Sequence, residues 1–289
     1  MVKILGLGPS GAALGSALGE AAVEERNKHY YKACGEAVPV ETPLVSREFV
    51  VDKVRRYRFF LGDSPIGEVS YGKPRWYIVD KSAWVESLRA AIRPGGEDDG
   101  IVVDARGPYA SRGEKLIVVM AYVEGIKRDD ETADFIYPPG LAGFFWIFPH
   151  GGLYNVGGGF LGVADPTPLV KNFVSKLGGR IKILKGAPLT VMPEVDLGIE
   201  GRYKVGEAAG LVYPLTGEGI RPGVISALAL ADSLGTRKPL DEYRRKIAPI
   251  VKQIQLQKRL LRLASKSISG GGGISLLADD ALLRDYIEE

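Results

Sequence analysis

Cysteine and histidine are nearly absent from this chain, which has one cysteine and two histidines among its 289 residues. An internal disulfide is therefore excluded, and a lone thiol is typical of a protein from a reducing compartment. Neither His29 nor His150 has further metal-ligating residues at a suitable spacing, so we expect no metal site.

Long hydrophobic runs are missing as well. The apolar run at residues 116–123 is far shorter than the roughly 20 residues that a membrane-spanning helix needs. No charged and apolar secretion signal precedes the first glycine-rich turn, at Gly6. We therefore expect a globular, cytoplasmic protein that does not cross a membrane, and a content of 45% hydrophobic and 25% charged residues favours this.

Overall charge is small, at +3, but basic residues are concentrated in one segment. Residues 236–266 contain ten lysines and arginines against two acidic residues. The basic residues are Arg237, Lys238, Arg244, Arg245, Lys246, Lys252, Lys258, Arg259, Arg262 and Lys266. Such a segment attracts lipid headgroups or nucleic acid, and it is equally typical of a solvated helix face.

The first hundred residues have the pattern of a parallel α/β sheet. A strand at residues 2–5 leads through a glycine turn into a helix at 10–19. We expect another strand at residues 76–79, then a helix to about residue 92 with Ser82 as its N-cap, and a strand at 101–103.

A different texture begins near residue 116, where strand-like runs alternate with glycine and proline. The runs lie at residues 116–123, 144–148, 154–158 and 189–192 and predict an inserted antiparallel sheet. A strand at 203–205 and a helix at about 222–234 then resume the first pattern. We expect the basic segment to be helical from 240 to 265, with an interruption near Pro249, and a glycine joint at 270–273 before a short final helix.

A glycine-rich turn lies directly between the first strand and the first helix. Gly6, Gly8 and Gly11 fit G-x-G-x-x-G, with Pro9 and Ser10 between them, and a helix N-terminus in this position binds a pyrophosphate. The alternative is a turn that only packs the helix against the strand.

An acidic residue about 20 positions after such a turn hydrogen-bonds a ribose hydroxyl in dinucleotide-binding folds. Glu25 lies 19 residues after Gly6, with Glu24 as the substitute. Both are also compatible with exposed loop acids.

A second glycine-rich segment follows the strand at 203–205. It contains Gly206 and Glu207 and continues as Pro214-Leu-Thr-Gly217-Glu-Gly219-Ile220. Gly217 and Gly219 expose N–H groups at the start of a helix, which suits another anionic or electron-rich part of an extended cofactor.

Four segments resemble the flavoprotein family of the para-hydroxybenzoate hydroxylase type, and most closely its geranylgeranyl reductase branch. The first is the segment from Gly206 to Ile220. The other three are Lys32-Ala-Cys34-Gly35-Glu36-Ala-Val38, similar to the family's flavin-facing segment; Asp104-Ala-Arg-Gly107, similar to its motif near the pyrophosphate; and Trp146-Ile-Phe148-Pro149-His150 with Gly157 and Gly159, similar to the reductase signature at the isoprenoid pocket. Four positions depart from the family pattern: Lys81 replaces the usual Arg, Glu207 replaces Asp, Phe144 replaces Tyr, and His150 replaces Lys.

The resemblance implies an α/β protein with a Rossmann-like FAD-binding lobe, an inserted antiparallel β-sheet substrate lobe and a C-terminal helical tail. The expected bounds are residues 1–115 and 196–235 for the FAD lobe, 116–195 for the substrate lobe and 236–289 for the tail. The expected FAD contacts are Gly6, Gly8, Pro9, Ser10, Gly11, Glu25, Cys34, Gly35, Lys81, Asp104, Gly107, Gly206, Glu207, Pro214, Gly217, Gly219 and Ile220. The expected isoprenoid contacts are Phe144, Trp146, Phe148, Pro149, His150, Gly157 and Gly159.

The aromatic residues and Cys34 each have two possible interpretations. Phe144, Trp146 and Phe148 offer a wide apolar surface, which suits a ligand without hydrogen-bonding groups and also suits core packing. Cys34 is the candidate catalytic residue, as a proton donor or a reactive thiol, and it is also compatible with an inert apolar side chain.

The activity that the resemblance implies is saturation of C=C bonds in geranylgeranyl chains, of geranylgeranyl diphosphate or archaeal-type ether lipid precursors, by hydride from reduced FAD. The electron donor would be NAD(P)H or ferredoxin. The basic tail would contact the inner membrane surface peripherally, and we expect no nucleic-acid partner. The alternatives are a flavin-dependent aromatic hydroxylase and a shortened, non-catalytic lipid-binding relative.

Overall fold

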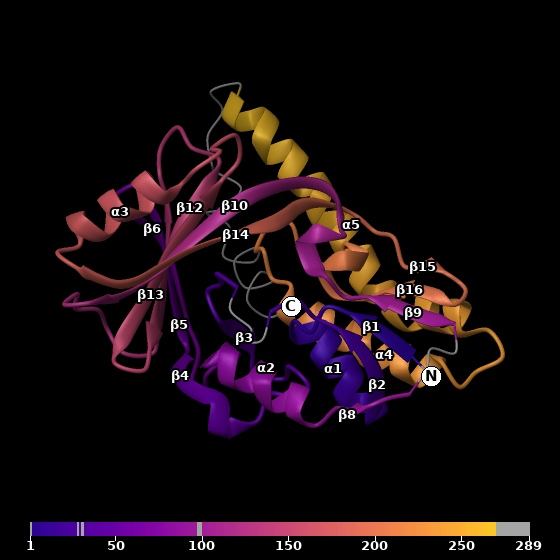
Figure 1. Cartoon of the computed structure of the whole chain (residues 1–289). Coiled ribbons are helices and arrows are strands. Elements are labelled where there is room, and N and C mark those ends of the chain that lie inside the picture. The colour runs from indigo at the N-terminus through magenta and orange to yellow at the C-terminus, as the bar shows by residue number, and fades with distance from the viewer. Residues whose placement is uncertain (1, 28, 30–31, 97–99, 270–289) are drawn as a thin grey trace.

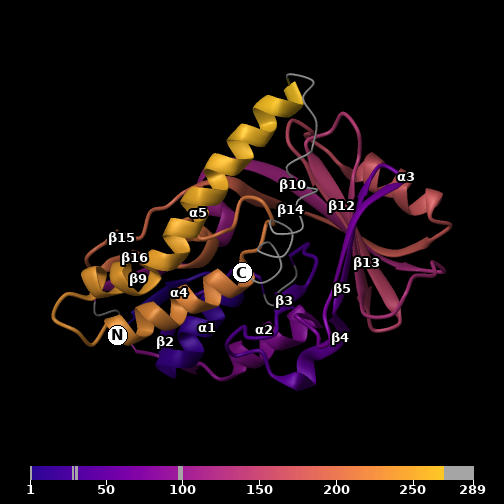
Figure 2. The same cartoon turned by 180° about the vertical axis from the view of Figure 1, so that it is seen from behind.

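The computed structural model describes residues 2–27, 29, 32–96 and 100–269, with the side chains of the last helix up to Arg262. In this part of the chain, three β-sheets and their helices form two lobes (Figure 1). Two long strands, β10 (Arg112–Glu124) and β14 (Arg180–Glu194), run from one lobe to the other (Figures 1 and 2). The short helix expected after the glycine joint lies outside the described residues.

A six-stranded sheet organises the first lobe, in the order β15-β16-β9-β1-β2-β8. Its strands are β1 (Val2–Leu5), β2 (Glu20–Glu24), β8 (Arg93–Pro94), β9 (Ile101–Asp104), β15 (Gly198–Ile199) and β16 (Arg202–Lys204). Every neighbouring pair is parallel except β15 with β16. The apolar β1 and β9 lie in the middle of the order, as expected of parallel strands that are buried on both faces.

Helices α1 (Pro9–Leu18), α2 (Lys81–Ala90) and α4 (Ile220–Ser233) pack on this sheet. A proline opens α1, where the missing N–H costs no hydrogen bond, and Gly19 ends the helix with a φ of 75°. The expected cap of α2 at Ser82 is wrong. Asp80 caps that helix, because its carboxylate accepts the Ala83 N–H at 3.0 Å.

Helix α5 (Pro239–Ser269) carries the basic segment and is continuous through Pro249, so the expected interruption is wrong. Its buried residues Tyr243, Ile247, Ile250 and Ile254 join the core of the first lobe. An internal proline costs a helix roughly 3 kcal/mol, and burying several large apolar side chains at about 1.5–3 kcal/mol each outweighs that cost.

A seven-stranded sheet organises the second lobe, in the order β14-β10-β13-β12-β11-β5-β6. Besides β10 and β14, its strands are β5 (Arg56–Leu61), β6 (Ser64–Ser70), β11 (Thr132–Tyr137), β12 (Gly143–His150) and β13 (Leu153–Phe160). All pairs are antiparallel except β5 with β11. Helix α3 (Thr167–Lys176) covers one face, where Phe173 stacks on Phe145.

Residues 56–70 differ from their expected place. They were expected in the FAD lobe, but they form β5 and β6 of the second sheet. The reason is a long-range parallel pairing of β5 with β11, which stacks Phe59 on Phe135 at a centroid distance of 5.3 Å.

The strand at residues 76–79 was expected in the parallel sheet, and this is also wrong. It is β7 (Trp76–Val79) in a three-stranded antiparallel sheet with β3 (Ala37–Pro39) and β4 (Val50–Val54), which follows the short 3₁₀ helix η1 (Arg47–Phe49). Ile78 is buried in the core of the second lobe rather than in that of the first.

Candidate cofactor and substrate site

A large cavity lies where the two lobes meet, with a volume of about 1190 Å³. The glycine turn before α1 and the N-terminus of α4 form one part of its wall. The face of the seven-stranded sheet that carries Phe144, Trp146 and Phe148 forms a second part of the wall. Leu256, Leu260 and Leu261 of α5 complete the wall. The cavity therefore joins backbone donors from one lobe to an apolar surface from the other.

The N-terminus of α1 opens into this cavity. Gly8 is its N-cap residue, and within the described residues no side chain caps the first N–H groups of the helix. Gly8, Pro9 and Ser10 lie in the cavity wall. Gly6 has a φ of 87°, and a Cβ on Gly11 would lie 2.0 Å from the Gly6 carbonyl oxygen. Both glycines are needed for the sharp turn that aims the helix at the cavity.

Glu25 lies in the cavity wall, at the place expected for a ribose-binding acid. Its carboxylate accepts the Leu7 N–H at 2.6 Å and the Asn27 N–H at 2.8 Å. Arg89 of α2 lies 3.5 Å from the same carboxylate and donates to the Leu7 carbonyl at 2.8 Å. These contacts fix the glycine turn against the end of β2, and they use part of the acceptor capacity of Glu25.

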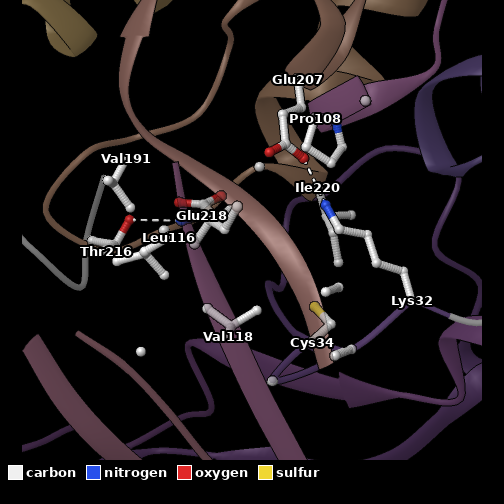
Figure 3. A pocket seen from close by; sticks show the side chains of 18 of the residues that line it. Lys32, Cys34, Pro108, Leu116, Val118, Val191, Glu207, Thr216, Glu218 and Ile220 are labelled. Carbon is white, nitrogen blue, oxygen red and sulfur yellow. Dashed lines mark hydrogen bonds and ion pairs between the residues drawn. The ribbon is translucent and has the colours of Figure 1, made fainter. Parts of the chain in front are cut away.

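A second helix N-terminus, that of α4, opens into the same cavity. Gly219 is the N-cap residue, again without a side-chain cap, and Gly217 has a φ of 70°. The N–H of Glu218 is held by the Thr216 hydroxyl at 3.0 Å (Figure 3). The Glu218 carboxylate pairs with Arg221 at 2.8 Å. Burial raises the pKa of Glu218 against the opposing effect of Arg221.

An ion pair in the cavity wall joins the second glycine-rich segment to the Lys32–Val38 segment. Glu207, in the 3₁₀ helix η3 (Gly206–Ala209), lies 2.7 Å from the ammonium group of Lys32 (Figure 3). The other carboxylate oxygen of Glu207 accepts the Thr190 N–H at 2.8 Å. The buried ammonium group of Lys81 donates to the Lys32 carbonyl at 2.8 Å, so η3 and α2 both hold the start of the Lys32–Val38 segment.

Cys34 projects into the cavity near Val118 (Figure 3). Its carbonyl accepts a hydrogen bond from the Asn155 amide at 2.8 Å, and its sulfur accepts the Glu36 N–H at 3.3 Å. Asn155 is fully buried, and its amide oxygen accepts the Trp146 indole N–H at 2.9 Å. Asn155 therefore ties the cysteine segment to the aromatic strand.

Glu36 follows Cys34 in a left-handed conformation with φ of 60°, which is costly for a residue other than glycine. Its buried carboxylate accepts the Tyr122 hydroxyl at 2.6 Å and lies 2.8 Å from His150 Nε2. Burial alone would raise the pKa of Glu36, but His150, Lys81 and Tyr122 outweigh that effect and lower the pKa. The carboxylate is therefore ionised at neutral pH and fixes the turn below Cys34.

The aromatic strand β12 divides its side chains between the two faces of the sheet. Phe144, Trp146 and Phe148 line the cavity, whereas Phe145 lies on the opposite face with α3. The alternation of a strand causes this division. Glycine at 157 lets the indole of Trp146 lie directly on β13, because a Cβ there would lie 2.1 Å from the ring.

Most of the residues expected at the site line this cavity, and six do not. The six are Gly11, Asp104, Pro149, His150, Gly157 and Gly206. Gly11, Gly157 and Gly206 act as close-packing positions behind the wall. Asp104 holds Arg106, and His150 turns to Glu36 beyond the end of the apolar wall.

Several residues of the site were missed because their roles depend on tertiary contacts. Asn155, Tyr122 and Arg89 stand in no motif, and Tyr137 and the leucines of α5 reach the cavity only through folding. Within the described residues, no group of three or more His, Cys, Asp or Glu is arranged to hold a metal ion. In the same part of the chain, no helix is long and apolar enough to span a bilayer.

Comparison with solved structures gives the class of fold. A geranylgeranyl bacteriochlorophyll reductase-like protein from Thermoplasma acidophilum superimposes with a TM-score of 0.76 at 17% identity, over 92% of this chain and 87% of that one. A flavin-dependent brominase superimposes with a TM-score of 0.65 at 14% identity, over 100% of this chain and 99% of that one. The fold is that of FAD-dependent oxidoreductases, as expected.

Comparison with curated sequences narrows the resemblance. Digeranylgeranylglycerophospholipid reductase 2 of Methanothermobacter thermautotrophicus is 29% identical over 197 residues, 57% of this chain and 50% of that protein. Geranylgeranyl diphosphate reductase of Rhodobacter capsulatus is 33% identical over 176 residues, 54% of this chain and 44% of that protein. No family model matches the chain. The resemblance to geranylgeranyl reductases is confirmed, and the matched region spans about half the length of these curated relatives.

Proposed function

We propose that this protein is an FAD-dependent reductase that saturates C=C bonds of a geranylgeranyl chain. The observation that carries the proposal is the continuity of the cavity, in which two uncapped helix N-termini and an aromatic wall share one volume of about 1190 Å³. A site for one small ligand typically measures about 300–1,000 Å³, so this cavity has room for a cofactor and part of a second ligand.

The residues present fit FAD. Free N–H groups at the start of α1 match the pyrophosphate, and the start of α4 with Gly217 and Gly219 matches an electron-rich ring edge. Glu25 and the Lys32–Glu207 pair line the same cavity. When it is bound, reduced FAD supplies the hydride for one carbon of the double bond.

The chain itself would position the substrate and handle the proton. Phe144, Trp146 and Phe148 exclude water and hold an apolar chain flat against the sheet. The thiol of Cys34, which lines the cavity, would hold the proton that the second carbon receives.

The two lobes would bind different ligands. The six-stranded sheet with α1 and α4 would hold FAD, and the seven-stranded sheet would hold the isoprenoid. The substrate would be geranylgeranyl diphosphate or an ether lipid precursor, and NAD(P)H or ferredoxin would supply the electrons.

Product analysis tests the proposal. The purified protein, loaded with FAD and reduced chemically without oxygen, is mixed with a geranylgeranyl lipid, and the lipid is analysed by mass spectrometry. A gain of two hydrogens for each reduced bond is expected. An unchanged lipid with FAD-loaded, fully reduced protein would contradict the proposal.

The basic face of α5 supports a further part of the proposal, peripheral contact with an anionic membrane. Arg244, Lys252, Arg259 and Arg262 are exposed on this helix, and each basic residue near anionic headgroups contributes about 1 kcal/mol. Replacement of the four by glutamine should abolish sedimentation with anionic liposomes and leave the neutral-liposome control unchanged. Equal sedimentation of both proteins would exclude this contact.

A second candidate, a flavin hydroxylase of aromatic rings, has support from the fold alone. A 2-methyl-3-hydroxypyridine-5-carboxylic acid oxygenase superimposes with a TM-score of 0.62 at 14% identity. Oxygen and NAD(P)H consumption that depends on a phenolic substrate would favour this activity over reduction of a lipid.

A further inference from the structure

The cavity wall that the seven-stranded sheet provides is almost entirely apolar. Its side chains are Leu116, Val118, Phe135, Tyr137, Phe144, Trp146, Phe148, Ala187, Leu189 and Val191. Within the described residues, two of these carry a polar side-chain atom, the indole N–H of Trp146 and the hydroxyl of Tyr137. Trp146 already donates to Asn155, so the Tyr137 hydroxyl is the polar atom that remains for a ligand.

Tyr137 ends strand β11, where its ring packs against Phe144 at a centroid distance of 5.8 Å. Its carbonyl accepts the Gly62 N–H at 2.8 Å, so the backbone of this residue is held in the sheet. Within the described residues, no hydrogen bond joins the phenol hydroxyl to another group of the protein, and the side chain is only partly buried. Removal from bulk water raises the pKa of Tyr137, so the hydroxyl remains a donor at neutral pH.

Three other tyrosines in the described part of the chain donate to a partner within the protein. Tyr122 donates to Glu36 at 2.6 Å, Tyr243 to the Lys204 carbonyl at 2.9 Å, and Tyr57 to the Val54 carbonyl at 3.4 Å. Phenol groups in apolar surroundings usually find a partner, because an unpaired hydroxyl there costs roughly 1–3 kcal/mol. Tyr137 lies on the apolar wall and is only partly buried, so a ligand oxygen that enters the cavity can accept the hydrogen bond of its hydroxyl.

We propose that Tyr137 is a specificity-determining residue that donates a hydrogen bond to an oxygen atom of the isoprenoid substrate. This deepens the proposed function, on which it rests: the substrate is an isoprenoid alcohol, ether or ester rather than a hydrocarbon. The oxygen-bearing part of the chain lies beside Phe144 at the Tyr137 end of the wall. The aromatic residues between Tyr137 and Cys34 hold the hydrocarbon part.

Binding of three lipids by calorimetry tests the assignment. The ligands are geranylgeraniol, its methyl ether, and the hydrocarbon in which hydrogen replaces the hydroxyl, each dispersed in the same detergent. The methyl ether only accepts a hydrogen bond, which separates the donor role of Tyr137 from an acceptor role. The proteins are wild type, Tyr137→Phe and Tyr154→Phe. Tyr154→Phe is a matched loss of a phenol oxygen, because the hydrogen-bond partner of Tyr154, the Arg128 carbonyl at 3.3 Å, lies away from the cavity.

Wild type and Tyr154→Phe should bind the alcohol and the ether about tenfold more tightly, relative to the hydrocarbon, than Tyr137→Phe does. Comparing ratios between variants removes differences in detergent partitioning among the ligands. If Tyr137→Phe and wild type had the same affinity ratio of alcohol to hydrocarbon, the assignment would be overturned. It would also be overturned if wild type preferred the alcohol but not the methyl ether to the hydrocarbon, because the ether can still accept a hydrogen bond from Tyr137. Retention of the ratio by a protein that takes up no flavin would contradict the proposed reductase activity and leave the role of Tyr137 standing.

Discussion

Gly157→Ala is the substitution that best tests how the aromatic wall is built. A Cβ on this residue would lie 2.1 Å from one carbon of the Trp146 ring and 2.6 Å from two others. Carbon atoms in contact prefer about 3.5–4.0 Å, so the indole must move by more than an ångström. The displaced ring would lose its hydrogen bond to Asn155, which also holds the Cys34 carbonyl.

The expected cost combines two effects. Overpacking in a core costs about 1–3 kcal/mol, and loss of a hydrogen bond that leaves a buried amide unpaired adds about 1 kcal/mol or more. We therefore expect the free energy of unfolding, measured with urea, to fall by about 2–4 kcal/mol. Gly72→Ala is the matched control, because nothing lies within 4 Å of its Cβ position and its φ is not in the left-handed region.

A double substitution separates the clash from general damage to β13. Trp146→Phe removes the atoms that the new methyl group meets, so Gly157→Ala should cost much less in that background. If Gly157→Ala were no more harmful than Gly72→Ala, the reasoning about a clamped indole would be refuted. An equal cost in the Trp146→Phe background would refute it too.

Two other predictions concern the cofactor half of the site and the turn below Cys34. Gly206→Ala should lower the free energy of unfolding by about 1–3 kcal/mol, because its φ is 59° and its Cβ would lie 2.1 Å from Ser10 Oγ. Ser10→Ala should recover part of this loss. If the costs of Gly206→Ala and Ser10→Ala simply added in the double variant, the proposed clash would be contradicted. The pKa of Glu36 is lowered from 4.5 in the folded protein, so its contribution to stability is complete above that pH and is lost as the pH falls through the folded pKa. Glu36→Gln should therefore make the free energy of unfolding less dependent on pH below 4.5, and an unchanged pH dependence would contradict the ionised state of Glu36.

Short-range patterns of the sequence were sufficient to predict the two glycine-rich turns that border the cavity. The turn at Gly6–Gly11 and the segment around Gly217 and Gly219 both contain glycines at fixed offsets between a strand and a helix, so the motif itself defines the local geometry. The sequence also predicted the aromatic strand β12. Its alternation decided which rings reach the cavity, which the sequence had left open between pocket and core.

Long-range pairing decided the remaining features. Residues 56–70 belong to the second sheet because β5 pairs with β11, which lies more than 60 residues away along the chain. His150 turns to Glu36 because the chain brings β12 next to the segment after Cys34, and no local spacing encodes that contact. Pro249 remains inside α5 because packing of the apolar face outweighs its local cost.

An absorbance spectrum of the purified protein from about 300 to 550 nm tests the central claim most directly, because flavin bands report both the cofactor and its redox state. The protein is incubated with FAD, freed of excess, bleached with dithionite without oxygen, and then mixed with a geranylgeranyl lipid. The account predicts bound flavin bands that bleach and that return when the lipid is added. Absence of flavin after incubation, or bands that stay bleached with every geranylgeranyl lipid, would contradict it.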